Sequence, residues 1–383
     1  IYRPSSNTGT INLSGDFSMT GGTLTKGGAG TGNFNFSKNG IQTYSKSSGT
    51  ISNSINFTVN SGSTLSMGTN VLDGGTGTFT LSSGGGLETG NTAGITTTGA
   101  TGSIQVSGAR TYNVGANYTF NGTSAQATGA GFTGANNLTI NNSAGVTLSG
   151  NASLAGTLTL TSGAFTVGSG NTITVSSGGS ISRTSGSLAA GTGAGTFTFL
   201  GTGTVTGTVG FNNVNIAGGV NFGTSSTING TLTINASGFV STNAPIYASG
   251  STLKYNSGGT YGRGTEWSAT SGAGYPHHVQ ISSSTTLSLG ANGGTSTARQ
   301  LAGDLTIDAN STLTLNAVGQ VMTKELTVKG NYINNGTTTL SGSIGGDLVL
   351  EGNLTDNNAF NANGRAIFFR GNNTQSITSN TDP

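Results

Sequence analysis

Apolar and small polar residues alternate along this chain in short runs, which are kept apart by turn-forming residues. Examples are Leu138-Thr-Ile140, Leu158-Thr-Leu160 and Leu232-Thr-Ile234, and dipeptides such as Asn-Gly, Ser-Gly and Gly-Gly separate runs of this kind. An alternation of period two is typical of a β-strand with one buried face. No stretch shows the i, i+3, i+4, i+7 apolar spacing of an amphipathic helix. The pattern therefore predicts an all-β protein.

Charged residues are scarce, which excludes several classes of protein. The 383 residues include 13 Lys and Arg, 11 Asp and Glu, two His and no Cys, and the formal net charge is +2. Binding to nucleic acid or to an anionic membrane requires clustered basic residues, so we expect neither a nucleic-acid partner nor membrane insertion. The 69 Gly raise the alternative of a disordered chain, but 32% of the residues are hydrophobic and 16 of them are Phe. We therefore expect an ordered fold.

One short motif recurs along the chain and identifies the candidate structural residues. An apolar residue is followed two positions later by an aromatic residue, and Gln stands six positions after that aromatic residue. We predict that the Phe residues fill the interior and that the Gln residues bond backbone groups at corners. The residues concerned are Phe36 with Gln42, Phe120 with Gln126, Phe369 with Gln375, and Phe199 in a degenerate copy that has Val205 in place of Gln.

A second alternating strand follows each motif, except the last, at a variable distance. The spacing from the aromatic residue to the end of that strand varies by several positions around a value of about 20 residues, which is typical of stacked coils joined by turns of variable length. It predicts a parallel, right-handed β-solenoid with roughly 20 residues per coil, continuous over residues 1–383 and made of imperfect multi-coil repeats. Stacked Asn, Ser and Thr side chains are expected to form ladders between coils.

The usual catalytic and metal-binding patterns are missing. The two histidines, His277 and His278, are adjacent, so we expect their side chains to lie on opposite faces of a strand. Six carboxylates between Asp304 and Asp356 leave calcium binding open as an alternative to a plain polar repeat, although no known calcium-loop motif is present. We predict a protein that is not an enzyme and that has no cofactor.

Several longer stretches resemble a known family. They are Asn136-Asn-Leu-Thr-Ile140, Phe211-Asn-Asn-Val-Asn-Ile216, Leu253-Lys-Tyr255 with the sequence up to Trp267, Val279-Gln-Ile281, Ala298–Ile307 and Gly364–Phe369. These segments are similar to the β-solenoid repeat regions of very large surface proteins of Bacteroidetes that the type IX secretion system exports. The resemblance implies an extracellular, cell-surface adhesin or filament. The ends at Ile1 and Asp382-Pro383 carry no signal segment and no sorting domain, so we expect a window of a much longer chain.

The sequence thus favours a structural role and leaves two alternatives. The main hypothesis is a segment of an extracellular fibre or stalk, which self-associates into a homo-oligomeric fibre or bundle and contacts other cell surfaces or glycans. A carbohydrate-binding module is the first alternative, with Tyr255, Tyr261, Trp267 and Tyr275 as exposed contact residues. The second alternative is an ice-binding face built from the pairs Thr157-Leu-Thr159, Thr196-Phe-Thr198 and Thr231-Leu-Thr233.

Overall fold

Nearly all regular structure in this protein consists of short strands. The computed structural model describes residues 8–189, 195–290 and 297–380, so Ile1 and Asp382-Pro383, on which the expectation of a longer chain rested, lie outside the described residues. Within this part there are 48 strands and one helix, the 3₁₀ turn η1 (Thr265–Trp267). The prediction of an all-β protein is confirmed. The chain divides into two compact units, residues 1–195 and 196–383, which are described in turn.

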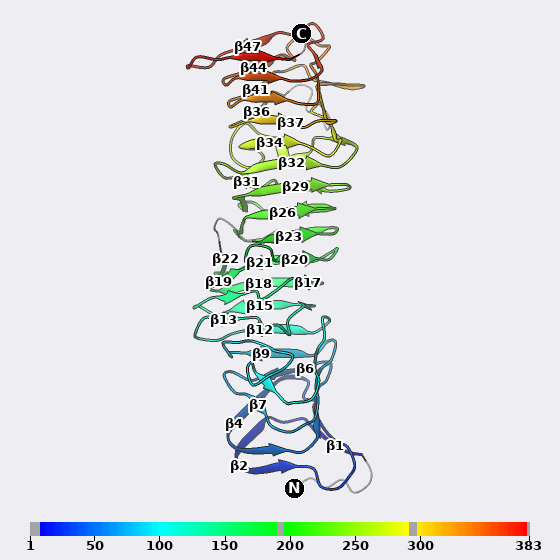
Figure 1. The fold of residues 1–383 in the computed structure, drawn as a ribbon, viewed down its shortest axis with the longest axis vertical. Helices are drawn as coiled ribbons and strands as arrows, with labels where there is room; N and C mark the ends of the chain where they lie inside the picture. The colour runs from blue at the N-terminus through cyan, green and yellow to red at the C-terminus, as the bar shows by residue number, and fades with distance from the viewer. Residues whose placement is uncertain (1–7, 190–194, 291–296, 381–383) are drawn as a thin grey trace. The chain divides into compact units, whose positions relative to one another are not determined.

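In the first unit, the strands of successive turns pair in parallel (Figure 1). Gly9 of β1 aligns with Gly32 of β3, which aligns in turn with Ile55 of β5. The strands, sheet by sheet, are β1 (Gly9–Leu13), β3 (Gly32–Phe36), β5 (Ile55–Val59), β8 (Phe79–Leu81) and β11 (Arg110–Tyr112); β2 (Phe17–Thr25), β4 (Gly40–Ser52), β6 (Ser63–Ser66), β9 (Gly86–Thr89), β12 (Asn117–Phe120), β15 (Leu138–Asn141), β18 (Thr157–Ser162) and β21 (Ser180–Arg183); β14 (Gly134–Ala135), β17 (Ala152–Leu154) and β20 (Thr172–Val175); β13 (Gln126–Ala127), β16 (Val146–Thr147), β19 (Ala164–Thr166) and β22 (Ser187–Leu188); and β7 (Leu72–Asp73) with β10 (Ile104–Gln105).

The second unit is built in the same way. Its strands also pair in parallel from turn to turn, except for the antiparallel pair β39 and β40. The strands, sheet by sheet, are β23 (Thr196–Phe199), β26 (Asn213–Ile216), β29 (Thr231–Asn235), β32 (Thr252–Asn256), β34 (His278–Ile281), β37 (Leu305–Ile307), β42 (Tyr332–Asn334), β45 (Leu354–Asp356) and β48 (Ile377–Ser379); β24 (Gly203–Thr206), β27 (Gly219–Asn221) and β30 (Phe239–Val240); β25 (Gly210–Phe211), β28 (Thr227–Ile228) and β31 (Ile246–Tyr247); β33 (Thr260–Gly262), β35 (Thr286–Ser288), β38 (Thr312–Thr314), β43 (Thr337–Thr339) and β46 (Phe360–Asn361); β36 (Arg299–Leu301), β41 (Leu326–Val328), β44 (Leu348–Leu350) and β47 (Ile367–Phe369); and β39 (Asn316–Ala317) with β40 (Gln320–Val321).

The architecture is a parallel β-solenoid with about 23 residues per turn, which confirms the predicted fold class. This turn is somewhat longer than the one expected from the sequence, because loops lengthen some turns. The turn that leads from Phe79 to its partner Arg110 is long, whereas the turn from Thr196 to its partner Asn213 is short. The continuity of the solenoid between the two units and its right-handed sense stay predictions.

The interior is made of apolar columns that run from turn to turn. In the second unit, Leu232, Leu253 and Val279 are stacked in register, and each is almost completely buried. The residues between the inward positions of these strands are less buried, as the alternation in the sequence predicted. Burial of one such side chain stabilises the fold by about 1.5–3 kcal/mol, so the columns hold successive turns together.

Outside the core, asparagine side chains connect successive turns. The Nδ2 group of Asn357 donates to Asn335 Oδ1 over 2.8 Å, and Asn380 Nδ2 donates to Asn357 Oδ1 over 2.6 Å. A similar bond of 3.0 Å joins Asn256 to Asn235. The predicted polar ladders are therefore present, and each one ties the position of one turn to the next.

Two glycines mark places where one turn comes very close to the turn before it. A Cβ on Gly230 would lie 2.6 Å from Oδ1 of Asn213 and 2.8 Å from the carbonyl oxygen of Asn212. In the first unit, a Cβ on Gly156 would lie 2.5 Å from Oδ1 of Asn137. Contacts this short exclude any side chain. An Asn pair followed one turn later by Gly is thus a structural signature that both units contain.

Candidate functional site

Three of the four motif phenylalanines lie in the interior, as predicted. Phe36, Phe120 and Phe199 are 0% exposed. Phe369 is 37% exposed, so the prediction of a buried ring is wrong at this position. Its strand, β47, is the last in its sheet, and within the described residues no further strand pairs with it to cover the ring. A motif side chain is buried only where turns lie on both sides of it.

The motif glutamine is a four-way hydrogen-bonding group in the copy around Phe120. Gln126 is 3% exposed, and its Nε2 group donates to the carbonyl oxygens of Thr89, over 2.8 Å, and Asn91, over 3.0 Å. Its Oε1 atom accepts from the N–H group of Gly122 over 3.0 Å and from Nδ2 of Asn142 over 2.9 Å. The side chain thereby joins three successive turns, satisfies the N–H group of Gly122, and adds a second donor to carbonyl oxygens that already accept from the backbone N–H groups of Asn121 and Gly94.

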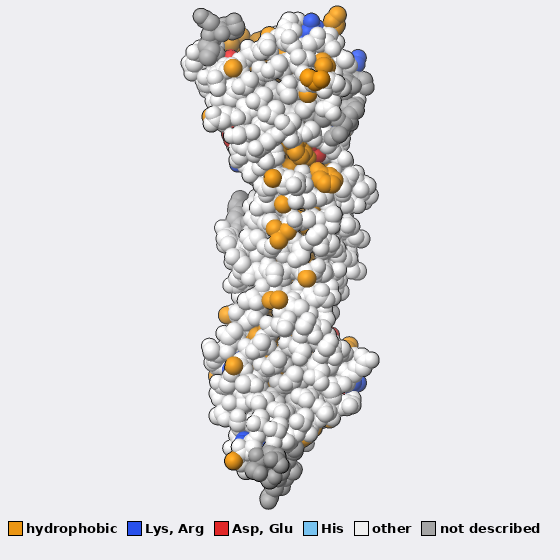
Figure 2. Space-filling model, turned by 90° about the vertical axis from the view of Figure 1, so that its right-hand side faces the viewer, with side chains coloured by type: hydrophobic (Ala, Val, Ile, Leu, Met, Phe, Trp, Pro, Cys, Tyr) orange, Lys and Arg blue, Asp and Glu red, His pale blue; other side chains and the backbone are white. Residues whose placement is uncertain are grey.

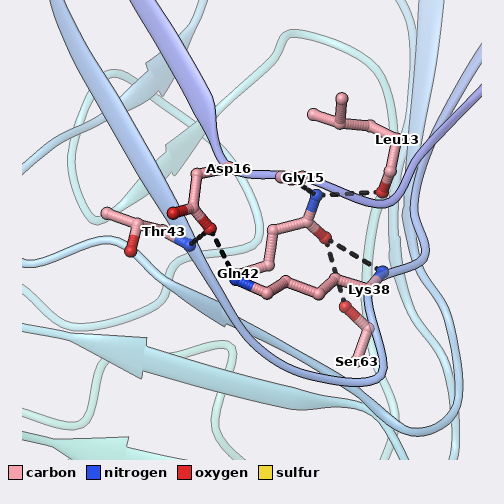
Figure 3. Close-up of polar contacts among 7 residues, drawn as sticks. All are labelled: Leu13, Gly15, Asp16, Lys38, Gln42, Thr43 and Ser63. Carbon is pink, nitrogen blue, oxygen red and sulfur yellow. Dashed lines mark hydrogen bonds and ion pairs between the residues drawn. The ribbon is translucent and has the colours of Figure 1, made fainter.

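Gln42 repeats this arrangement near the start of the chain (Figure 3). Its Nε2 group donates to the carbonyl oxygens of Leu13, over 2.9 Å, and Gly15, and its Oε1 atom accepts from Ser63 Oγ over 3.3 Å. Beside it, the Lys38 Nζ group lies 3.0 Å from Oδ1 of Asp16. The glutamine again bonds residues of the turns before and after its own.

Gln375 makes similar bonds near the other end of the chain. Its Oε1 atom accepts from the N–H group of Gly371 over 2.8 Å, and its Nε2 group donates to the carbonyl oxygens of Leu350 and Gly352 over 3.1 and 2.6 Å. In all three copies, therefore, the glutamine side chain bonds backbone groups at a corner, as predicted. The place of these glutamines in the molecule is structural, since each joins its own turn to at least one neighbouring turn.

The predicted surface aromatics are not a surface cluster. Tyr255 and Trp267 are 0% exposed, so their assignment as contact residues is wrong, while Tyr261 and Tyr275 are half-buried. Tyr255 fills an interior column, where it aligns with Ile234 on one side and with Ile281 on the other. Trp267 lies in η1 with its side chain buried, and its Nε1 group donates to the carbonyl oxygen of Gln300 over 2.8 Å.

A buried polar cluster surrounds η1 in the second unit. Glu266 is completely buried, and its Oε1 atom accepts from the Tyr255 hydroxyl over 3.1 Å and from the N–H group of Gly264 over 2.7 Å. Burial raises the pKa of the Glu266 carboxyl, although the Gly264 bond and the charge of Arg263 oppose the shift. Burial and the nearby Glu266 together raise the pKa of Tyr255 well above its ordinary value.

Arg263 holds this segment in place. It is 2% exposed, and its Nη1 group donates to the carbonyl oxygens of Gly264 and Trp267, both over 2.9 Å. Its Nε group donates to the carbonyl oxygen of Leu289 over 3.1 Å. The side chain therefore fixes both the start and the end of η1.

Arg110 has a comparable role in the first unit. Its guanidinium bonds the carbonyl oxygens of three loop residues, Val106, Thr96 and Gly99. Sequence reasoning missed both Arg110 and Arg263, since nothing in the pattern around either one indicates a buried charge.

Beside the polar cluster the second unit has a cavity of about 500 Å³. It is lined by β30, β33, the beginning of η1 and Arg299. Arg299 is 4% exposed, and its pKa is lowered to about 10 by burial and by the charge of Arg263. Of the four predicted contact residues, Tyr261 lines this cavity, but sequence reasoning did not identify the cavity or the role of Arg299.

The two histidines lie together, contrary to expectation. The centroids of the His277 and His278 rings are 4.4 Å apart, because His277 precedes β34 and does not follow the alternation of the strand. His278 Nδ1 accepts from the N–H group of Asp304 over 2.9 Å. Burial lowers the pKa of His277, and the neighbouring His278 adds to this effect.

Three further findings bear on the alternatives. No group of three or more His, Cys, Asp or Glu side chains that could hold a metal ion occurs among the described residues, including the acidic stretch from Asp304 to Asp356. Thr233 of a predicted ice-binding pair aligns with Asn215 on one side and with Lys254 on the other. These neighbours interrupt the regular threonine array that ice binding would need. None of the described helical structure is long and apolar enough to cross a membrane.

The comparisons with known proteins return no relative. No model of a protein family matches the chain, and neither a curated protein nor a solved structure matches it. The function proposed below therefore rests on the fold, on the geometry of the site and on the resemblance seen in the sequence.

Proposed function

We propose that this chain is a non-catalytic structural segment of an extracellular fibre or stalk. The observation that carries the proposal is the construction of each unit, in which parallel strands pair from turn to turn around buried apolar columns. Buried glutamines and exposed asparagine ladders add bonds between the same turns, as at Gln126 and Asn357. Stretching or bending such a stack would break many of these bonds at once.

The surface supports the second part of the proposal, which is lateral association. In the view of Figure 2, most of the visible face is neither charged nor hydrophobic: it is backbone and other side chains, with few charged groups and scattered hydrophobic ones. The low charge of the whole sequence, 6% of residues, weakens electrostatic repulsion between copies. We propose that copies associate through Ser, Thr and Asn faces into a homo-oligomeric fibre or bundle, and that other cell surfaces or glycans are further partners.

The cellular setting of the proposal rests on the sequence resemblance. The segments around Ile140, Ile216 and Ile281 are similar to repeats of giant surface proteins of Bacteroidetes, for which type IX secretion is the expected route of export. We therefore propose a location outside the cell, at its surface, with a role in attachment or in filament assembly.

The decisive experiment images the native protein. Gold-labelled antibodies against this chain, applied to intact cells of the source organism, are expected to mark surface-attached fibres in negative-stain electron micrographs. Labelling that appears only after the cells are permeabilised would contradict the proposal. So would turnover of a polysaccharide by the purified chain if mutation of a single carboxylate abolished it.

A second candidate function, carbohydrate binding, is favoured by one observation. The cavity beside η1 combines a buried arginine with aromatic and hydroxyl side chains. This candidate function is compatible with the proposed structural role, because a stalk can also carry a binding site on its side.

A further inference from the structure

The cavity beside η1 is large enough for a small ligand. Its volume of about 500 Å³ lies within the range of roughly 300–1,000 Å³ that is usual for ligand pockets. All of its walls belong to the second unit. A smaller cavity of about 230 Å³ shares Thr265 and Ser268 with it, so the recess extends along η1.

Arg299 differs from the other buried arginines in what it bonds. Arg110 and Arg263 each bond several backbone carbonyl oxygens and so have clear structural roles. Arg299 is just as buried, yet within the described residues its Nη1 group donates to the adjacent carbonyl oxygen of Ala298 over 3.0 Å and its Nε group has no partner. A buried guanidinium is normally paired, because desolvation of its charge is costly.

No acidic side chain among the described residues compensates Arg299. Glu266 is the carboxyl of the cluster described above, and its Oε1 atom accepts from Tyr255 and Gly264. Its Oε2 atom has no hydrogen-bond partner among the residues that the structure describes, so no bond links this carboxyl to Arg299. The ion pairs within the described part of the chain do not include Arg299. Its environment is instead made more positive by Arg263, which contributes to the lowered pKa of Arg299. The position therefore favours an anion supplied from outside.

The remaining walls indicate the kind of molecule that carries the anion. Phe239 is 48% exposed, and the half-buried ring of Tyr261 also lines the cavity. Hydroxyl-bearing residues, Ser241, Thr260 and Thr265, line it as well. Apolar ring faces beside hydroxyl donors and acceptors fit a ligand whose own ring has one apolar face and a polar rim.

We propose that this cavity binds an acidic saccharide, with the carboxylate of a sugar residue on Arg299 and the sugar ring against Phe239 and Tyr261. The carboxylate would accept two parallel N–H bonds from the guanidinium, which is the geometry that arginine offers and lysine does not. This proposal rests on the second candidate function, carbohydrate binding, and specifies its substrate class; it is independent of the proposed structural role.

Isothermal titration calorimetry with the full chain tests the proposal. The probe is a disaccharide of galacturonic acid, and its control is the fully methyl-esterified disaccharide, which keeps the rings but has no charge. The acid is expected to bind, and the ester is expected to bind about tenfold or more weakly, because it cannot form the charge-assisted bonds. Equal affinity for the acid and the ester, or no binding of the acid, would overturn the proposal.

Two variants locate the site. Arg299→Gln is expected to weaken binding of the acidic disaccharide about tenfold or more, whereas Arg183→Gln, in the first unit, should leave it unchanged. If Arg299→Gln does not fold, as judged by circular dichroism, Phe239→Ala replaces it, since this exposed ring can be removed without opening the core. Unchanged binding in the folded variant would overturn the assignment.

Inorganic sulfate provides the last arm of the test. Displacement of the disaccharide only at sulfate concentrations far above those of the disaccharide supports a saccharide site. Sulfate that binds as tightly as the disaccharide would reduce the cavity to a general anion site and overturn the proposal.

Discussion

Replacing Gln126 by Glu tests whether the buried glutamines hold the turns together. The two side chains have the same shape, but an ionised carboxylate accepts hydrogen bonds and donates none. The carbonyl oxygens of Thr89 and Asn91 would lose the donor that now lies 2.8 and 3.0 Å away. Each oxygen would keep a backbone donor, the N–H group of Asn121 for Thr89 and that of Gly94 for Asn91, so the change removes two ordinary hydrogen bonds, which contribute about 0.5–1.5 kcal/mol each. The change should therefore destabilise the first unit by about 1–3 kcal/mol at neutral pH.

The matched control is Gln105→Glu. Gln105 is half-buried and its Nε2 group donates to the carbonyl oxygen of Gly102 over 3.0 Å, so the expected cost is about 0.5–1.5 kcal/mol. Urea unfolding followed by circular dichroism gives the change in stability. Hydrogen exchange at the Gly122 amide, which donates to Gln126, reports the same change locally. Equal losses in the two variants would refute the reasoning.

Three further predictions follow from the same contacts. Gly230→Ala should lower the urea midpoint clearly, because the new Cβ would lie 2.6 Å from an atom of the preceding turn. The control, Gly259→Ala, should leave the midpoint unchanged, since no other described part of the chain lies within 4 Å of its Cβ. Equal shifts of the midpoint in the two variants would contradict the close approach at Gly230. Phe120→Ala should cost about 3–5 kcal/mol, and Phe369→Ala, in the same motif but 37% exposed, should cost much less, which thermal unfolding of both variants checks. Burial raises the folded-state pKa of Glu266 above its usual 4.5, so this carboxyl destabilises the fold as pH rises from about 4.5 through that folded-state value. Glu266→Gln should flatten the dependence of the urea midpoint on pH in this window, and an unchanged slope would contradict the shift.

Much of the fold could be predicted because apolar and polar residues alternate within each strand, so that each strand indicates its own buried face. The alternation in Leu138-Thr-Ile140 assigns an inward face without any knowledge of the neighbouring turns, and both apolar side chains are indeed buried. The same rule, applied consistently, would have placed Tyr255 inside, since it stands two residues after the buried Leu253. The error arose from treating the aromatic residues of a Gly-rich stretch as a group.

The site was harder to predict because it lies outside the periodic strands. Trp267 and Glu266 are buried by a 3₁₀ turn whose path depends on carbonyl oxygens that Arg263 reaches, and no local pattern specifies such a path. Arg299 belongs to a strand, yet nothing in Arg299-Gln-Leu301 shows that this residue borders a cavity. Phe369 shows a different limit, since burial of a motif residue depends on whether another turn covers it.

The parallel register has a consequence for how genes encoding such chains can change. Within the second unit, the strands of a turn pair with the turn before it and the turn after it, as Leu253 does with Leu232 and Val279. Unequal recombination that removes or duplicates one whole turn would therefore bring together surfaces that already match, and no distant contact would be lost. A mutation that deletes half a turn would instead place loop residues opposite strands. We expect natural variants of this protein to differ in length by whole turns, about 23 residues each.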